Sequence, residues 1–222
     1  MGDTTIHARG DRPRENPREN PTVERLVFFT DAVVAIAMTL LILPLMESVS
    51  EAKADNLTTA EYLNEHGGQL FSLALSFVLI AVFWRQHHGL FDRVERETGA
   101  LVWLDIAWMF TIVWLPVATA LTGSLHTDTL QQVLYIGTML ANAVIMVLMN
   151  VVVIRTPRLL KAGQERPIGG LSAAIALALL FGVALLVAVL WQDDKYYPMF
   201  LLFLTGPLAR VIRSQLARRI PA

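Results

Sequence analysis

Six long apolar runs, separated by short polar stretches, constrain this 222-residue chain more than any other feature. A hydrocarbon core about 30 Å thick needs about 20 apolar residues in a helix that rises about 1.5 Å per residue. Hydrophobic residues make up 55% of the chain, and a mean hydropathy of +0.51 is too high for a soluble domain. We therefore expect an all-α integral membrane protein. Its six predicted spans are 25–46, 69–90, 100–122, 131–154, 168–191 and 196–213.

Basic residues are distributed unequally between the two ends of these spans. Of the 18 Lys and Arg residues, all but two lie on the side that holds both termini, and only Lys53 and Lys195 lie on the other. Because cytoplasmic loops are enriched in Lys and Arg, both termini are predicted to be cytoplasmic. The sixth span is the shortest and is broken near Gly206 and Pro207. A chain of only five spans would place the two termini on opposite sides and so break the one-sided distribution of Lys and Arg.

Polar segments flank the predicted membrane unit of residues 23–213. Residues 1–22 repeat a Pro-Arg-Glu-Asn unit and are expected to form a disordered cytoplasmic tail, and residues 214–222 are expected to form a basic one. The outer loop at about 47–68 is acidic, with a helix start signal at Thr58 and Thr59. This loop either concentrates cations near an entrance or is simply solvated.

Several classes of site are not expected. The chain has no cysteine, which excludes disulfides and thiolate metal sites. His87 and His88 are adjacent, so they point to different helix faces and are not expected to share a metal ion. The arginines after the last span are explained by topology and by anionic membrane lipid, so neither a cofactor nor a nucleic-acid partner is predicted.

The first span has two different faces. Asp31 lies about 140° around the helix from Ile36, whereas Thr39 and Leu43 lie within about 60° and 20° of Ile36. Together with Leu40 they form a mainly apolar stripe. Asp31 therefore points toward neighbouring helices. A carboxylate inside a membrane needs a partner side chain or contact with water.

The motif Arg25-x-x-x-Phe29-Thr30-Asp31 resembles the R-x-x-x-F-S-D signature of the transmembrane protein 175 family of potassium channels. The resemblance continues through residues 35–41 and 83–88 and through the third span, over about 23–120. Two positions depart from the family pattern. Thr30 replaces the usual Ser and keeps its hydroxyl, whereas Asp105 stands where Asn is more common and adds a charge.

This resemblance implies a potassium channel of the bacterial plasma membrane that lacks the T-V-G-Y-G filter, a string absent from this sequence. Bacterial members have one six-helix unit per chain, so four chains would surround a central pore lined by the first helix. Ile36 would form a hydrophobic constriction, Leu43 would narrow the outer part and Leu40 would line the pore. Thr39 would form the selectivity ring, holding potassium transiently. Without the resemblance, ordinary helix packing would explain the same stripe.

A structural network is implied for the remaining signature positions, in which Trp84, His87 and Thr30 are plausible partners for Asp31. Its expected members are Arg25, Phe29, Thr30, Asp31, Trp84, His87 and Asp105. A secondary transporter, or a permease for protons or other cations, is the alternative function. No nucleophile or metal-ligand spacing accompanies the carboxylates, so an enzyme is not expected.

Overall fold

The chain folds as an all-α membrane bundle, seen in a computed structural model that describes residues 21–124, 128–191 and 205–219. Within these ranges there is no β-strand, and five segments are long and apolar enough to cross a membrane. Four of them are single helices, α4 (Gly67–Phe91), α5 (Gly99–Ser124), α6 (Thr129–Arg155) and α7 (Ile168–Trp191). The fifth is the first span, which is built from two helices.

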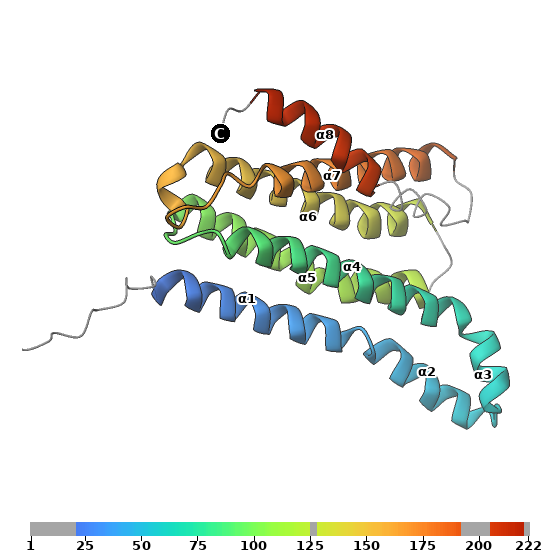
Figure 1. Ribbon diagram of the computed structural model, residues 1–222. Helices are drawn as coiled ribbons and strands as arrows, with labels where there is room; N and C mark the ends of the chain where they lie inside the picture. Colours follow the sequence, from blue (N-terminus) through green and yellow to red (C-terminus); the bar gives the residue numbers. More distant parts are fainter. Residues whose placement is uncertain (1–20, 125–127, 192–204, 220–222) are drawn as a thin grey trace, which may run out of the picture.

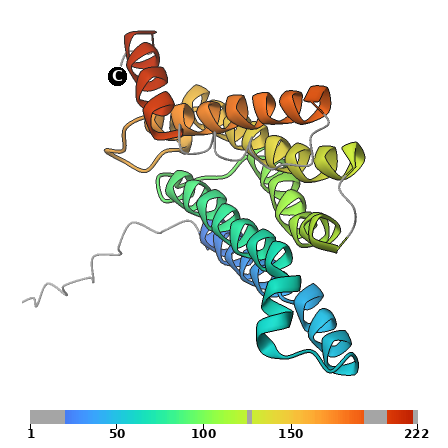
Figure 2. The same ribbon diagram turned by 90° about the vertical axis from the view of Figure 1, so that its right-hand side faces the viewer.

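The helices run side by side in an order that leaves the first span at one edge (Figures 1 and 2). Helix α1 (Pro21–Leu40) packs on α4 and α5, and α6 packs on α5 and α7. Large apolar side chains such as Trp108, Ile112 and Met139 fill the centre and are fully buried. As a consequence, no other described helix covers one flank of α1.

The first span is not one continuous helix, which corrects the predicted run of 25–46. Helix α1 ends at Leu40, and α2 (Leu43–Ala54) begins after a turn. Pro44 explains the break, because it has no N–H and its ring clashes with the carbonyl four residues earlier, that of Leu40. Helix α2 then continues far into the stretch that was expected to be a loop.

A short helix, α3 (Thr59–Glu65), follows α2 and confirms the start signal at Thr58. Thr58 caps it reciprocally with Glu61, since each side chain bonds the backbone N–H of the other residue. The Thr58 hydroxyl, and then its backbone N–H, hold the pKa of Glu61 below its usual value. Tyr62 ties α3 to α2, because its hydroxyl lies 2.8 Å from that of the buried Ser48.

The predicted sixth span, 196–213, lies partly outside the described residues. Its described part belongs to α8 (Thr205–Arg219), which packs on α7 and continues through most of the expected C-terminal tail. Residues 1–20 of the expected N-terminal tail also lie outside the described ranges.

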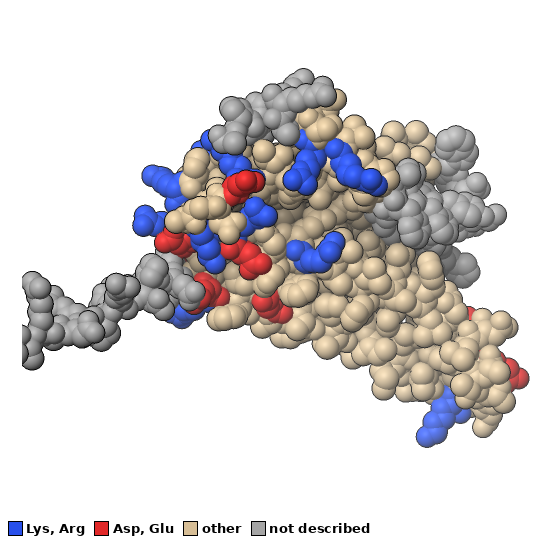
Figure 3. Space-filling model, viewed as in Figure 1, with Lys and Arg blue, Asp and Glu red and all other residues tan. Residues whose placement is uncertain are grey.

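Lys and Arg side chains gather at one end of the bundle, which we call the basic end (Figure 3). There the α4–α5 connection lies against the α6–α7 connection, which contains a short 3-10 helix at Pro157–Leu159. Three backbone hydrogen bonds tie them together: Glu95 N (2.7 Å) and Arg96 N (3.4 Å) both donate to the Leu159 carbonyl, and Lys161 N donates to the Arg93 carbonyl (2.9 Å). The loops at the basic end are therefore held to one another.

Candidate functional site

The predicted pore stripe lies on the flank of the first span that no other described part of the chain covers. Ile36, Leu40 and Leu43 are 59%, 39% and 51% exposed. On the opposite side of the same helix, Val34 and Ala37 are buried against the rest of the bundle. Burial within one chain therefore does not account for this stripe of apolar side chains.

Thr39 is also exposed, and its hydroxyl has a fixed orientation. Its Oγ1 donates a hydrogen bond to the Ile36 carbonyl at 2.7 Å. This is the local bond that ordinary helix packing would predict. Because the proton is used within the helix, the lone pairs of Oγ1 are left to accept from water or to coordinate a cation.

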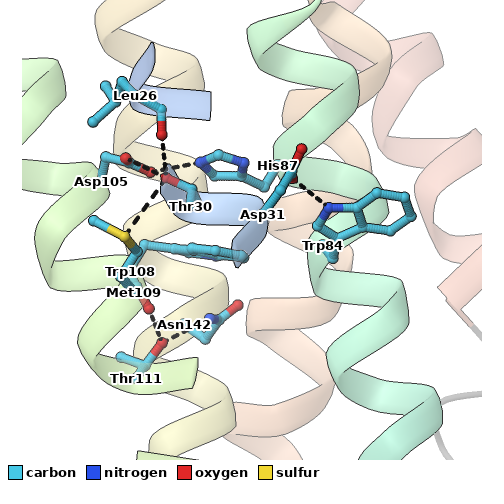
Figure 4. Close-up of polar contacts among 10 residues, drawn as sticks. All are labelled: Leu26, Thr30, Asp31, Trp84, His87, Asp105, Trp108, Met109, Thr111 and Asn142. Carbon is cyan, nitrogen blue, oxygen red and sulfur yellow. Dashed lines mark hydrogen bonds and ion pairs between the residues drawn. The ribbon is translucent and has the colours of Figure 1, made fainter. Parts of the chain in front are cut away.

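Behind the stripe, three polar side chains from three helices meet in the fully buried interior (Figure 4). His87 Nε2 on α4 lies 2.5 Å from Asp105 Oδ1 on α5. Thr30 Oγ1 on α1 lies 3.0 Å from Asp105 Oδ2 and 2.9 Å from the Leu26 carbonyl, so its one proton lies between two acceptors. Asp105 thus joins the three helices through hydrogen bonds.

Aromatic rings hold His87 in place. The rings of Phe91 and Trp108 each stack on the imidazole at a centroid distance of 4.4 Å. His87 Nδ1 has no hydrogen-bond partner within the described part of the chain. A buried N–H without an acceptor is costly, so the arrangement favours the tautomer whose proton lies on Nε2, facing Asp105.

Asp31 belongs to a separate contact. Trp84 Nε1 donates a hydrogen bond to Asp31 Oδ1 at 2.7 Å (Figure 4). Of the three partners expected for Asp31, this is the one that contacts it, whereas Thr30 and His87 bond to Asp105 instead. The reason is geometric: neighbouring residues lie about 100° apart around a helix, so Thr30 faces α5 while Asp31 faces α4.

Removing the indole donor tests the contribution of this contact. We expect Trp84→Phe to lower the free energy of unfolding by about 1 kcal/mol, because Asp31 loses its hydrogen-bond donor. Thermal unfolding of the detergent-solubilised protein measures the effect. Trp103→Phe is the matched control, since Trp103 is largely exposed and its indole makes no hydrogen bond to the described residues. Equal shifts for the two variants would contradict a stabilising role for the contact.

The remaining signature residues are not part of either contact. Arg25 and Phe29 both lie on the exposed surface of α1. Within the described ranges, the Arg25 guanidinium forms no ion pair. The signature is therefore split between a buried part and a surface part.

Two further polar clusters in the interior were not predicted. Ser76, Thr119 and Tyr135 connect α4, α5 and α6 through two hydrogen bonds of 2.8 Å each. Asn142 donates to Thr111 Oγ1 at 2.7 Å. The sequence feature that could have predicted these clusters is the presence of hydroxyl and amide side chains in apolar spans, where such groups form hydrogen bonds between helices. In the described residues no group of three or more His, Asp or Glu side chains is arranged to hold a metal ion.

Comparison with known proteins identifies the part of the chain that holds this site. The model of a family described as the endosomal/lysosomal potassium channel TMEM175 matches residues 25–116. A potassium channel of Chryseobacterium sp. is 28% identical over 105 residues, which cover 47% of this chain and 51% of the relative. The endosomal/lysosomal proton channel TMEM175 of Danio rerio is 34% identical over 113 residues, covering 48% of this chain and 22% of the relative. The match thus spans about half of the first relative and about a fifth of the second.

A solved structure resembles the fold over nearly the whole length. It is the crystal structure of a variant of the potassium channel MtTMEM175 in complex with a nanobody–MBP fusion protein. The TM-score is 0.58 at 19% sequence identity, and the similarity covers 93% of this chain and 96% of the other. This likeness supports the helix arrangement beyond the segment matched in sequence.

Proposed function

We propose that this chain forms a potassium-selective, leak-like cation channel, because residues 25–116 match the model of a family described as the endosomal/lysosomal potassium channel TMEM175. The observation that carries the proposal is the exposed stripe of Ile36, Thr39, Leu40 and Leu43 within the matched segment. A channel of this kind needs no T-V-G-Y-G filter, because side chains of the first helix take its place.

Four copies of the chain surround the pore in this proposal. A single chain leaves the stripe uncovered, and a symmetric ring turns the same stripe of every copy toward one axis. The buried contacts of Asp105 support this arrangement, because they hold α1 against α4 and α5 on the side opposite the stripe. The pore face is thereby presented by a rigid element.

Ile36 and Leu43 form the narrow parts of the pore. A ring of apolar side chains excludes water at small diameters and thus closes the pore to ions without any charge. Leu40 lines the wall between them. The turn after Leu40 lets α2 take its own direction, so the pore can widen toward the acidic loop.

Thr39 is the proposed selectivity residue. Its hydroxyl oxygen, held by the bond to the Ile36 carbonyl, forms a ring of four oxygens that replaces part of the hydration shell of the ion. Potassium gives up its water more readily than sodium, so such a ring favours potassium.

The proposed location is the bacterial plasma membrane, with both termini in the cytoplasm. The gathering of Lys and Arg at the basic end supports this orientation. The acidic residues Glu47, Glu51 and Glu65 then lie at the outer mouth, around a cavity of about 560 Å³.

Proton permeation is the second candidate, because relatives such as that of Danio rerio are named proton channels. A proton can cross an apolar constriction along a transient file of water that excludes a potassium ion. A coupled secondary transporter, the other alternative, would place charged sites near the membrane midplane.

The test of the proposal is potassium flux into liposomes that contain the purified protein. We expect wild-type flux well above that of empty liposomes and a clear preference for potassium over sodium. Flux carried by protons alone would favour the second candidate. Absence of flux from folded, tetrameric protein would contradict both channel functions.

Substitution of Thr39 tests the origin of the selectivity. We expect Thr39→Ala to reduce the preference for potassium over sodium roughly fivefold, which corresponds to the loss of about 1 kcal/mol from an absent oxygen ligand. Thr39→Ser keeps the hydroxyl and serves as the matched control. The measurement is the ratio of potassium to sodium flux. A ratio unchanged in Thr39→Ala would assign selectivity to other groups.

A further inference from the structure

A small cavity at the basic end lies between α4, α6 and the start of α7, away from the pore stripe. It has a volume of about 280 Å³, equal to that of roughly nine water molecules in the liquid. Arg85, Gln86 and Arg93 line it from α4 and the loop that follows, Asn150 lines it from α6, and Pro167 and Gly170 line it at α7.

The cavity carries positive charge without a neutralising group. Arg85 lies six residues before the end of α4, about 9 Å inside the helix from its end. Its exposed guanidinium makes no ion pair or hydrogen bond to a described residue. Arg93 donates one bond of 3.4 Å to the Glu165 carbonyl, which is neutral. No carboxylate lines the cavity, so an anion bound there would face two guanidinium groups and no opposing negative charge.

The first turn of α7 adds to this preference. Pro167 and Gly170 bring the N-terminal end of a 24-residue helix to the cavity wall. Backbone N–H groups at such an end carry partial positive charge and favour phosphate oxygens.

Asn150 specifies a second property of the ligand. Its side chain is 1% exposed, and its Nδ2 donates to the Met146 carbonyl at 2.8 Å, which fixes the amide orientation. Its Oδ1 has no partner within the described residues. Gly170 lies directly against this oxygen at the cavity wall, since a Cβ atom there would lie 2.8 Å from it. An unpaired buried acceptor calls for a donor, such as a ligand hydroxyl.

From these observations we propose that the cavity binds the headgroup of an anionic phospholipid of the phosphatidylglycerol class. The phosphodiester lies between Arg85 and Arg93, and a headgroup hydroxyl donates to Asn150 Oδ1. The position of Arg85 near the end of a helix long and apolar enough to span a membrane favours a lipid over a dissolved anion, because basic pockets between such helices bind anionic lipid headgroups. Figure 3 shows basic side chains over α4 and α8 on this face of the molecule.

The first test measures binding of phosphatidylglycerol to the delipidated full chain in detergent, by native mass spectrometry. We expect the double variant Arg85→Gln/Arg93→Gln to weaken binding at least roughly tenfold, since each basic group near a lipid phosphate contributes to the affinity. Arg96→Gln is the matched control, because Arg96 is exposed at the same end but does not line the cavity. Equal affinities of the double variant and the control would overturn the proposal.

The second test examines the roles of the hydroxyl and of the lipid chains. Phosphatidylmethanol keeps the single negative phosphodiester but has no hydroxyl, so wild-type protein should prefer phosphatidylglycerol, and Asn150→Leu should abolish that preference. A preference unchanged in Asn150→Leu would overturn the assignment of the hydroxyl. Free glycerol 3-phosphate should bind much more weakly than the lipid, and equal affinity would overturn the lipid assignment. Binding is measured without ion flux, so the result does not depend on the channel function.

Discussion

Ile36→Ala is expected to increase potassium flux through reconstituted protein roughly tenfold, which corresponds to about 1.4 kcal/mol off the barrier to permeation. Ile36 is 59% exposed on the uncovered flank of α1. In a symmetric assembly its four copies meet at the axis, where removing three carbon atoms from each widens the ring. A wider ring is hydrated more easily, so the apolar barrier falls.

The matched control is Ile106→Ala. Ile106 is an isoleucine of α5 that is 42% exposed but lies outside the stripe, so its truncation should leave the flux close to the wild-type value. Both variants should remain tetrameric by size-exclusion chromatography with light scattering. If the two variants conduct alike, Ile36 is not the constriction.

Most of the spans could be predicted closely from the sequence. The predicted runs 100–122 and 168–191 compare with helices Gly99–Ser124 and Ile168–Trp191. The agreement has a simple cause: the apolar requirement of the bilayer determines where each run begins and ends, and charged or capping residues such as Asp128 border the runs.

The division of the first span could not be predicted from hydropathy. The residues around Pro44 are as apolar as their neighbours, so the run reads as continuous. Helix α2 then extends past the apolar part through Glu47, Glu51 and Lys53. Hydropathy shows where the apolar run begins and ends. Helix formation depends on backbone hydrogen bonds, so a helix can continue beyond the membrane core.

The partners of the polar groups were predicted in kind but only partly in pairing, since Trp84 contacts Asp31 as expected whereas two other partners do not. Asp31 drew attention because it is the carboxylate of the signature, and Thr30 and His87 were assigned to it. In the structure both contact Asp105, which lies 75 residues from Thr30 in the chain. Such pairing depends on how each helix is rotated about its axis, and a single sequence contains no direct measure of that rotation.

Asp105→Ala is expected to cause the largest loss of stability among single substitutions of the site. The change removes the acceptor that His87 faces in a fully buried location, and it removes one of the two acceptors of Thr30, whose hydroxyl keeps the Leu26 carbonyl. Leaving a buried donor without a partner costs about 1–3 kcal/mol, and the lost Thr30 bond adds to this, although bonds between helices in membranes contribute less than in soluble proteins. We expect a loss of about 2–4 kcal/mol in thermal unfolding of the solubilised protein.

Asp105→Asn is the control that separates charge from hydrogen bonding. Its carbonyl oxygen can accept the proton from His87 Nε2, while its amide group can donate to Thr30 Oγ1, whose own proton then goes to the Leu26 carbonyl. We therefore expect Asp105→Asn to lose less than half as much stability as Asp105→Ala. Similar losses for both variants would mean that the negative charge itself holds the three helices together.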